Sequence, residues 1–275
     1  MAVKTTSETS VNPYFDASRP QVIEDVDTLL SLNVQKGYYA PGDQTPVDDI
    51  RSLYHSPYLT SGIFRGQLRD WPLIPKGFRG LVEPAEEKPL TPVIRSFQWS
   101  LATHKFREFC SRAEGQNPAF PRASVDRMAI AQHFGVPTPL LDWTQSIFPA
   151  VFCAVRDVFN DPEFETSLRV FVYHVIDERL LRSGLPEEGD LADVGESAFI
   201  KPFAIDRRIE RQRGVFTFHP YPSHRPRRIP ASVYILEWPL IARLLRLMKG
   251  FGFTEDYYFP DYAGIAHAVM SGTSL

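Results

Sequence analysis

The feature that most constrains the fold is a set of strand-like segments in the second half of the chain. Residues 168–175 alternate in side-chain character and are rich in β-branched and aromatic residues, as a half-buried strand requires. Residues 214–218 and 233–238 share this composition, and residues 199–205 are expected to be extended. The 20 Phe and 11 Tyr residues also favour β structure. The sequence therefore predicts a sheet drawn mainly from the second half of the chain.

Segments with helical periodicity lie mostly in the first half. Helices are predicted at residues 22–32, 92–110, 125–134, 148–155, 239–249 and 263–270, with loops at residues 37–46, 72–92 and 253–262. For the apolar run 148–155 the alternative is a buried strand, because periodicity alone does not distinguish the two. Because helices and strands do not alternate in regular βαβ units, the fold class is α+β, with a helical N-terminal half packed on the sheet. Residues 1–20 are polar and contain two prolines, so they are predicted to form a flexible N-terminal arm. Residues 21–275 are expected to be a single domain.

Charge and cysteine content exclude some classes of protein. The net charge is −3, from 30 basic and 33 acidic residues, so no global field attracts nucleic acid. A nucleic-acid partner would need a local basic patch, and the best candidates are two clusters: Arg207, Arg208, Arg211 and Arg213, then Arg225, Arg227 and Arg228. Two cysteines, Cys110 and Cys153, are too few for a disulfide framework, and Cys153 is expected to be buried.

The expected location is the cytoplasm, with no membrane partner. The first residues lack the apolar core of a signal peptide. The chain contains no run of about 18 apolar residues, which a membrane-spanning helix needs.

The tripeptide Phe64-Arg65-Gly66 is the first segment that suggests chemistry. It ends a short apolar stretch, so Arg65 is expected at the end of a strand. A guanidinium group offers five donors in a rigid fork that suits phosphate and carboxylate groups, and glycine allows a ligand or another backbone to come close. The alternative is a surface ion pair beside a turn glycine.

The second segment, residues 132–144, concentrates polar side chains between a helix end and an apolar stretch. Asp142 lies between Leu141 and Trp143, so in an extended segment it points away from both of them. The alternative is that Asp142 or Thr144 caps the following helix. His133 is either a site residue or a capping or core histidine.

The third segment, residues 207–217, changes from polar to strand-like at Gly214. If it is extended, Glu210 and Gln212 share one face, and the Gln212 amide suits a sugar hydroxyl. The alternative is a basic surface turn before a strand. The chain has no Gly-x-Ser-x-Gly elbow, no P-loop and no Gly-x-Gly-x-x-Gly motif. Its histidines lack the His-x-x-x-His spacing, so no metal is expected.

Together the three segments resemble the FRG domain family, which is named after a Phe/Tyr-Arg-Gly motif. The resemblance spans roughly residues 60–265. It rests on residues 63–75, 132–144, 150–154 and 208–216 and on Phe259-Pro260-Asp261. Pro139 stands where the family usually has Arg, a difference that would remove one ligand-binding cation.

The family in turn looks like a distant relative of the ADP-ribosyltransferase fold, which implies a split, mostly antiparallel β core. On that likeness Arg65 holds the pyrophosphate or the nicotinamide ribose of NAD, Thr138 and Asp142 shape the nicotinamide pocket, and Gln212 replaces the usual acid. Glu210 or Asp142 then supplies the negative charge. The likeness also places these residues in the NAD site: Phe64, Gly66, Gln67, Gln132, His133, Trp143 and Thr144.

The resemblance therefore implies an NAD-dependent ADP-ribosyltransferase. We expect a bacterial toxin or anti-phage defence effector that modifies a protein or nucleic-acid acceptor, with an antitoxin or phage trigger as a further partner. One alternative is a non-catalytic sensor module that binds a nucleotide or a phage protein. A third is a nuclease that uses Asp142 and Glu210 with a divalent metal.

Overall fold

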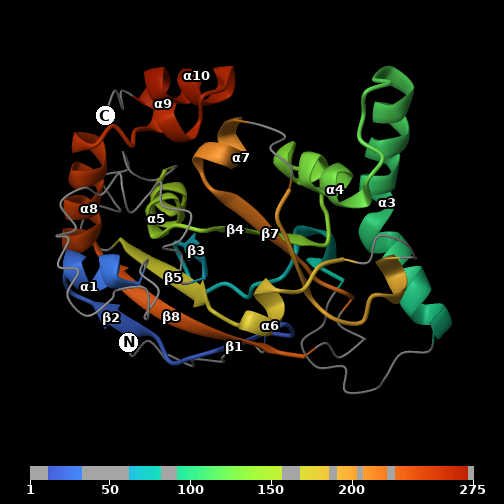
Figure 1. The fold of residues 1–275 in the computed structure, drawn as a ribbon, viewed down its shortest axis with the longest axis horizontal. Coiled ribbons are helices and arrows are strands. Elements are labelled where there is room, and N and C mark those ends of the chain that lie inside the picture. Colours follow the sequence, from blue (N-terminus) through green and yellow to red (C-terminus); the bar gives the residue numbers. More distant parts are fainter. Residues whose placement is uncertain are drawn as a thin grey trace, which may run out of the picture.

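A computed structural model describes residues 12–32, 62–81, 92–156, 168–185, 191–202, 207–221 and 227–271. The predicted loop at residues 37–46 lies outside these ranges. The described strands form one eight-stranded sheet in the order β1-β8-β5-β3-β4-β7-β6, and β2 also pairs with β8 (Figure 1). Their bounds are β1 Phe15–Ala17, β2 Gln21–Ile23, β3 Ile63–Gln67, β4 Leu140–Thr144, β5 Arg169–Val175, β6 Ala198–Ile200, β7 Gly214–Phe218 and β8 Ile229–Glu237.

The class is α+β with a mostly antiparallel sheet, as predicted. β1 and β2 run parallel to β8, and all other neighbouring strands are antiparallel. The pairing between β3 and β4 is limited to one residue pair, Phe64 opposite Thr144. The two halves of the sheet therefore diverge from this point.

The prediction of an N-terminal arm is wrong for residues 12–20, while residues 1–11 lie outside the described ranges. Phe15–Ala17 pairs with Ile229–Ala231, and Tyr14 and Phe15 are completely buried. Two buried aromatic side chains outweigh the polar character of the surrounding residues because each removes a large apolar area from water.

The described helices include α1 Val26–Ser31, α3 Pro92–Gln116, α4 Ser124–His133, α5 Ile147–Val155, α6 Glu178–Leu181, α7 Arg207–Arg211, α8 Trp238–Gly250, α9 Glu255–Tyr258 and α10 Tyr262–Ser271, with short 3₁₀ turns at Lys76–Phe78 and Leu191–Asp193. The predictions of α3, α4, α5, α8 and α10 are confirmed, with small differences at the ends. The helix predicted at residues 22–32 begins only at Val26, because Asp25 caps it by accepting a 2.7 Å hydrogen bond from the Thr28 amide.

Two predictions of local structure need correction. Residues 207–211 form α7, so Glu210 and Gln212 do not share the face of a strand. α9 lies in the segment predicted to be a loop. α7 and α9 thus add to the helices that were predicted at residues 239–249 and 263–270 in the C-terminal half.

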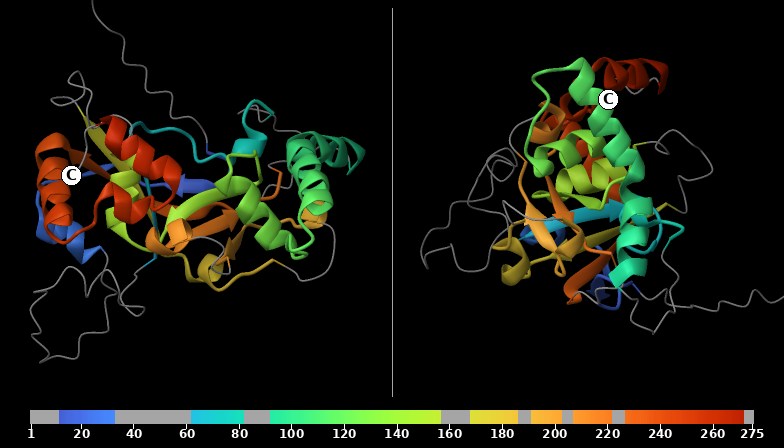
Figure 2. Two further views of the ribbon diagram at one scale, coloured as in Figure 1. Left: turned by 90° about the horizontal axis from the view of Figure 1, so that it is seen from above. Right: turned by 90° about the vertical axis from the view of Figure 1, so that its right-hand side faces the viewer.

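The helices lie around the divergent part of the sheet. α8 and α3 occupy opposite ends of the long axis, and α5 lies between them near β3 and β4 (Figure 1, Figure 2). One core cluster joins α1, α5 and α8 to β3, β5 and β8, and a smaller cluster joins α4 to β6 and β7. None of the described helices is both long and apolar enough to cross a bilayer.

Candidate functional site

A cleft of about 450 Å³ opens where β3 and β4 diverge. It is lined by most of the residues that the sequence singled out: Phe64, Arg65, Gly66, Gln132, His133, Asp142, Trp143, Thr144 and Gln212. Its volume falls in the range of small-molecule sites. The structure thus brings three sequence segments to one concave surface.

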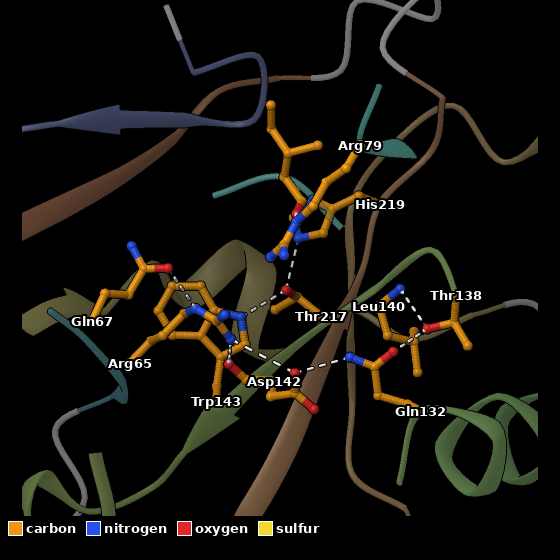
Figure 3. A network of polar contacts seen from close by, with 11 residues as sticks. Arg65, Gln67, Arg79, Gln132, Thr138, Leu140, Asp142, Trp143, Thr217 and His219 are labelled. Carbon is orange, nitrogen blue, oxygen red and sulfur yellow. Dashed lines mark hydrogen bonds and ion pairs between the residues drawn. The ribbon is translucent and has the colours of Figure 1, made fainter. Parts of the chain in front are cut away.

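Arg65 bridges the divergence between β3 and β4. Pro139 and Gln145 direct their backbone hydrogen bonds toward the β7 side, so by the alternation of an antiparallel ladder Asp142 turns its carbonyl toward β3. That carbonyl accepts a 2.7 Å hydrogen bond from Arg65 Nη1 (Figure 3). The Arg65 guanidinium group therefore donates a hydrogen bond to a β4 carbonyl that lies beyond the single residue pair joining β3 and β4.

The Asp142 carboxylate faces the cleft. Asp142 is the exposed residue of an otherwise buried strand, so the prediction that it points away from Leu141 and Trp143 is confirmed. It does not cap α5, whose N-cap position is Ser146. Its Oδ2 lies 3.7 Å from Arg65 Nη1.

A relay of hydrogen bonds orients this carboxylate. Gln132 on α4 donates from Nε2 to Asp142 Oδ2 at 2.9 Å. The Thr138 hydroxyl donates to Gln132 Oε1 at 2.6 Å and accepts from the Leu140 amide. Because the amide oxygen of Gln132 accepts the hydrogen bond from Thr138, the side-chain NH₂ group of Gln132 points toward Asp142 (Figure 3). Thr138 is completely buried, so it acts behind the cleft wall rather than in it.

Gly66 serves the packing of α5. A Cβ atom at this position would lie 2.1 Å from the Ala150 carbonyl oxygen, closer than atoms can approach. The glycine thus allows the backbone of α5 to rest on β3, and this contact places Pro149, Ala150 and Cys153 in the cleft wall.

Gln212 and Thr144 connect the cleft wall to neighbouring segments. The Thr144 hydroxyl donates to the Gln212 carbonyl at 2.7 Å. The Gln212 side chain donates from Nε2 to the Tyr258 carbonyl on α9 at 3.1 Å. The next residue, Arg213, has a φ of 48°, which turns the chain from α7 into β7.

Sequence reasoning missed a cationic part of the cleft. Arg156, Arg208 and Phe259 line it, although the last two belong to segments that carried the family resemblance. The guanidinium carbons of Arg156 and Arg208 lie 3.9 and 4.4 Å from the centroid of the Phe259 ring. Arg156 is held by the buried Glu255, at 2.8 Å from Nε to Oε1. The signal for Arg156 was a lone cation directly after the apolar run of α5.

Other predicted residues lie elsewhere. Glu210 is exposed on α7 and is not among the residues that line the cleft, so it does not supply the negative charge there. Gln67 lines a neighbouring hollow. Cys153 is exposed, which corrects the expectation that it is buried, because its side of α5 faces the cleft rather than the sheet.

The basic clusters largely serve internal contacts. Arg227 makes two hydrogen bonds to the Asp177 carboxylate, and Arg228 donates to the Phe15 carbonyl. Arg211 donates to the carbonyls of Asp256 and Tyr257. Arg225 lies outside the described residues. Within the described residues, no group of three His, Cys, Asp or Glu side chains could hold a metal ion.

A buried polar chain supports the wall behind Trp143. Trp143 Nε1 donates to Thr217 Oγ1 at 2.8 Å, and Thr217 Oγ1 lies 2.7 Å from His219 Nε2. The indole is a donor only, so Thr217 Oγ1 accepts from it. Ser197 Oγ lies 2.9 Å from His219 Nδ1, so each ring nitrogen of His219 has a hydroxyl partner. Burial lowers the pKa of His219 to about 3, so its ring is neutral near pH 7.

The fold and the site define an α+β protein with a cationic cleft that contains one carboxylate among its described lining residues. Residues 60–162 match the family model of the FRG domain. The resemblance to the FRG domain family predicted from the sequence is therefore confirmed over that segment. The match includes Arg65, Gln132 and Asp142 and ends before Arg208 and Gln212. No curated protein and no solved structure matches the chain.

Proposed function

We propose that the cleft binds NAD and that the protein transfers ADP-ribose from NAD to an acceptor. The observation that carries this proposal is the convergence of Arg65 and Asp142 on one cleft, together with Arg156 and Arg208. Guanidinium groups suit a pyrophosphate. A carboxylate stabilises the positive charge that develops on the ribose during glycosidic cleavage.

In the proposed reaction the bond between the ribose C1′ and the nicotinamide nitrogen breaks. The bonding electrons leave with nicotinamide, which departs neutral, and Asp142 stabilises the oxocarbenium character at C1′. A nucleophilic atom of the acceptor then bonds to C1′ and releases its proton to solvent. Pro139 stands where the family usually has an arginine, and Arg156 and Arg208 supply cations to the cleft.

The test is incubation of the folded protein with NAD labelled in the adenylate half, alone and with protein, DNA or RNA acceptors. The proposal expects release of nicotinamide and transfer of label. An Asp142→Asn variant serves as the control, because it keeps the size of the side chain and removes its charge. Folded protein that neither releases nicotinamide nor transfers label would rule out the enzymatic proposal.

A specific observation favours a second candidate, a non-catalytic module that binds a nucleotide. On the ADP-ribosyltransferase likeness Gln212 replaces the usual acid, and its amide donates to the Tyr258 carbonyl, so it has a structural role. This candidate predicts that NAD or ADP raises the melting temperature, that Arg65→Ala abolishes the effect, and that no turnover occurs. The nuclease hypothesis requires both Asp142 and Glu210 in the site. Glu210 does not line the cleft, so the second carboxylate is missing there.

A further inference from the structure

A second hollow of about 670 Å³ adjoins the cleft. The two share three residues, Arg65, Gly66 and Cys153, so they meet on either side of the Phe-Arg-Gly motif. The remaining described residues of the second hollow are Gln67, Leu68, Trp71, Pro72, Ile74, Arg79, Gly80 and Ala154. A ligand longer than the cleft would therefore reach the second hollow at Arg65.

The second hollow has the chemistry of a nucleotide site. Trp71 is 52% exposed, which leaves surface available for stacking. None of the described residues that line the hollow carries a carboxylate, whereas Arg65 and Arg79 both line it. An aromatic ring beside cations favours a nucleobase with an adjoining phosphate, and the lack of a carboxylate disfavours a cationic acceptor side chain.

Hydrogen bonds connect Trp71 to the motif. Gln67 donates from Nε2 to the Trp71 carbonyl at 3.0 Å and accepts from Arg65 Nε at 3.3 Å. Gln67 therefore sets the position of the Trp71 backbone relative to the guanidinium group. Arg79 is fixed in turn, because its Nε donates to the Ile74 carbonyl at 3.2 Å.

The positive charges of Arg65 and Arg79 favour the binding of an anion. Burial lowers the pKa of Arg65, the charge of Asp142 opposes that shift, and the like charge of Arg79 lowers the pKa further. Arg65 and Arg79 therefore repel each other, and a pyrophosphate near both groups would relieve the repulsion.

We infer that the dinucleotide spans both hollows, with its adenine ring stacked on Trp71, its pyrophosphate at Arg65 and its nicotinamide ribose beside Asp142. This inference rests on the proposed function and adds the site of the adenosine half. The same chemistry would also suit a nucleotide of a nucleic-acid acceptor. The shared lining of the two hollows favours the adenosine half, because one continuous ligand then fills both.

The test compares the binding of NAD with the binding of molecules that represent each of its halves. Binding of NAD, ADP and nicotinamide mononucleotide is measured by calorimetry for the unmodified protein, Trp71→Ala, Trp71→Phe and the control Phe97→Ala, which removes an exposed aromatic ring that does not line either hollow. Trp71→Ala should weaken NAD and ADP roughly tenfold or more, the scale of one lost base stack. Nicotinamide mononucleotide should bind as before. Trp71→Phe should recover most of the loss, and Phe97→Ala should change nothing.

A labelling experiment checks the position of the ligand without using turnover. Cys153 is exposed at the junction of the two hollows, whereas Cys110 is buried. ADP should therefore slow the reaction of a maleimide with Cys153 in the unmodified protein, and at the same ADP concentration it should protect less in Trp71→Ala.

Three outcomes would overturn the inference in distinguishable ways. If Trp71→Ala binds NAD and ADP normally, the adenine site is wrong while the proposed function stands. If Trp71→Ala weakens a single-stranded oligonucleotide but not ADP, the hollow belongs to a nucleic-acid acceptor. If the unmodified protein binds neither NAD nor nicotinamide mononucleotide, the proposed function fails and this inference fails with it.

Discussion

Arg65 donates a 2.7 Å hydrogen bond to the backbone carbonyl of Asp142, while the carboxylate of the same residue lies 3.7 Å from the donating nitrogen. The shorter contact is thus to the strand and the longer one to the side chain. Because the carbonyl lies where the pairing of β3 and β4 ends, Arg65 links the two halves of the sheet. It also remains partly accessible, with 18% of its side chain exposed, so one residue serves both the fold and the cleft.

Replacing Arg65 with alanine should therefore reduce stability as well as ligand binding. The variant loses a hydrogen bond from a charged donor, so the free energy of unfolding should fall by about 1.5–3 kcal/mol, measured by urea denaturation. Asp142→Asn is the matched control. It keeps the backbone carbonyl and removes only an exposed charge, so stability should change by less than about 1 kcal/mol. Equal losses in the two variants would contradict a structural role for the Arg65–carbonyl contact.

Asp142→Asn should separate binding from chemistry. If Asp142 stabilises the developing charge on the ribose, nicotinamide release should slow by about 10²-fold or more, the scale of losing one preorganised electrostatic group. ADP should bind almost normally, because Asp142 is placed beside the nicotinamide ribose rather than the adenosine half. Chromatography of nicotinamide gives the rate and calorimetry gives the affinity. An unchanged rate would remove Asp142 from the mechanism.

Two glycine substitutions should change stability in opposite directions. In Gly66→Ala the new methyl group would lie 2.1 Å from the Ala150 carbonyl oxygen, so α5 must move away from β3, and stability should fall by at least about 1–3 kcal/mol. In Gly115→Ala, near the end of α3, nothing lies within 4 Å of the new atom, and the better helix propensity should add up to about 1 kcal/mol. Thermal or urea unfolding measures both, and a Gly66→Ala protein of normal stability would show that the close packing of α5 is dispensable.

The sequence predicted the elements whose signals are local. α5 is a continuous apolar run, β5 alternates, and α8 ends near Gly250 as expected. These elements depend on short-range periodicity, which a single sequence displays directly. The expectation that Arg65 and Asp142 share one site came from the resemblance to the ADP-ribosyltransferase fold and not from local patterning.

The remaining features depend on partners that are distant in the sequence. β1 has only three residues, and its pairing exists because Ile229–Ala231 lies beside it. The polar segment 207–211 has no clear period, and it forms a helix whose C-terminal end is followed by the positive φ of Arg213. Arg156 joins the site through Phe259 and Glu255, and no pattern around residue 156 indicates those contacts.

His219 should make stability depend on pH. Burial lowers its pKa to about 3 from an ordinary value of 6.5, so between these values the unfolded chain binds a proton that the folded protein does not. The stabilising contribution is therefore complete above about pH 6.5 and is lost as pH falls toward 3, at about 1.4 kcal/mol per pH unit. Going from pH 7 to pH 5 should cost about 2 kcal/mol through this residue.

Urea unfolding at pH 7 and pH 5 should show this effect, and His219→Asn should reduce the difference between the two free energies of unfolding by that amount. Because the variant is also expected to be less stable overall, an NMR titration of the histidine ring in the unmodified protein provides a second measurement. A His219 ring that titrates near pH 6.5 in the folded protein would contradict the prediction.

Gln212→Glu should not create a better enzyme, although it introduces the acid that the proposed ADP-ribosyltransferase likeness implies at this position. The Gln212 amide donates to the Tyr258 carbonyl, and a carboxylate would place two oxygen acceptors face to face. Leaving a partly buried acceptor without its donor should cost about 1–3 kcal/mol, so we expect lower stability and no gain in nicotinamide release. Gln212→Ala is the control, because it removes the donor without adding a charge. A Gln212→Glu protein that is as stable as the unmodified chain and releases nicotinamide faster would show that position 212 acts on the ribose, and the structural role assigned to its amide would be wrong.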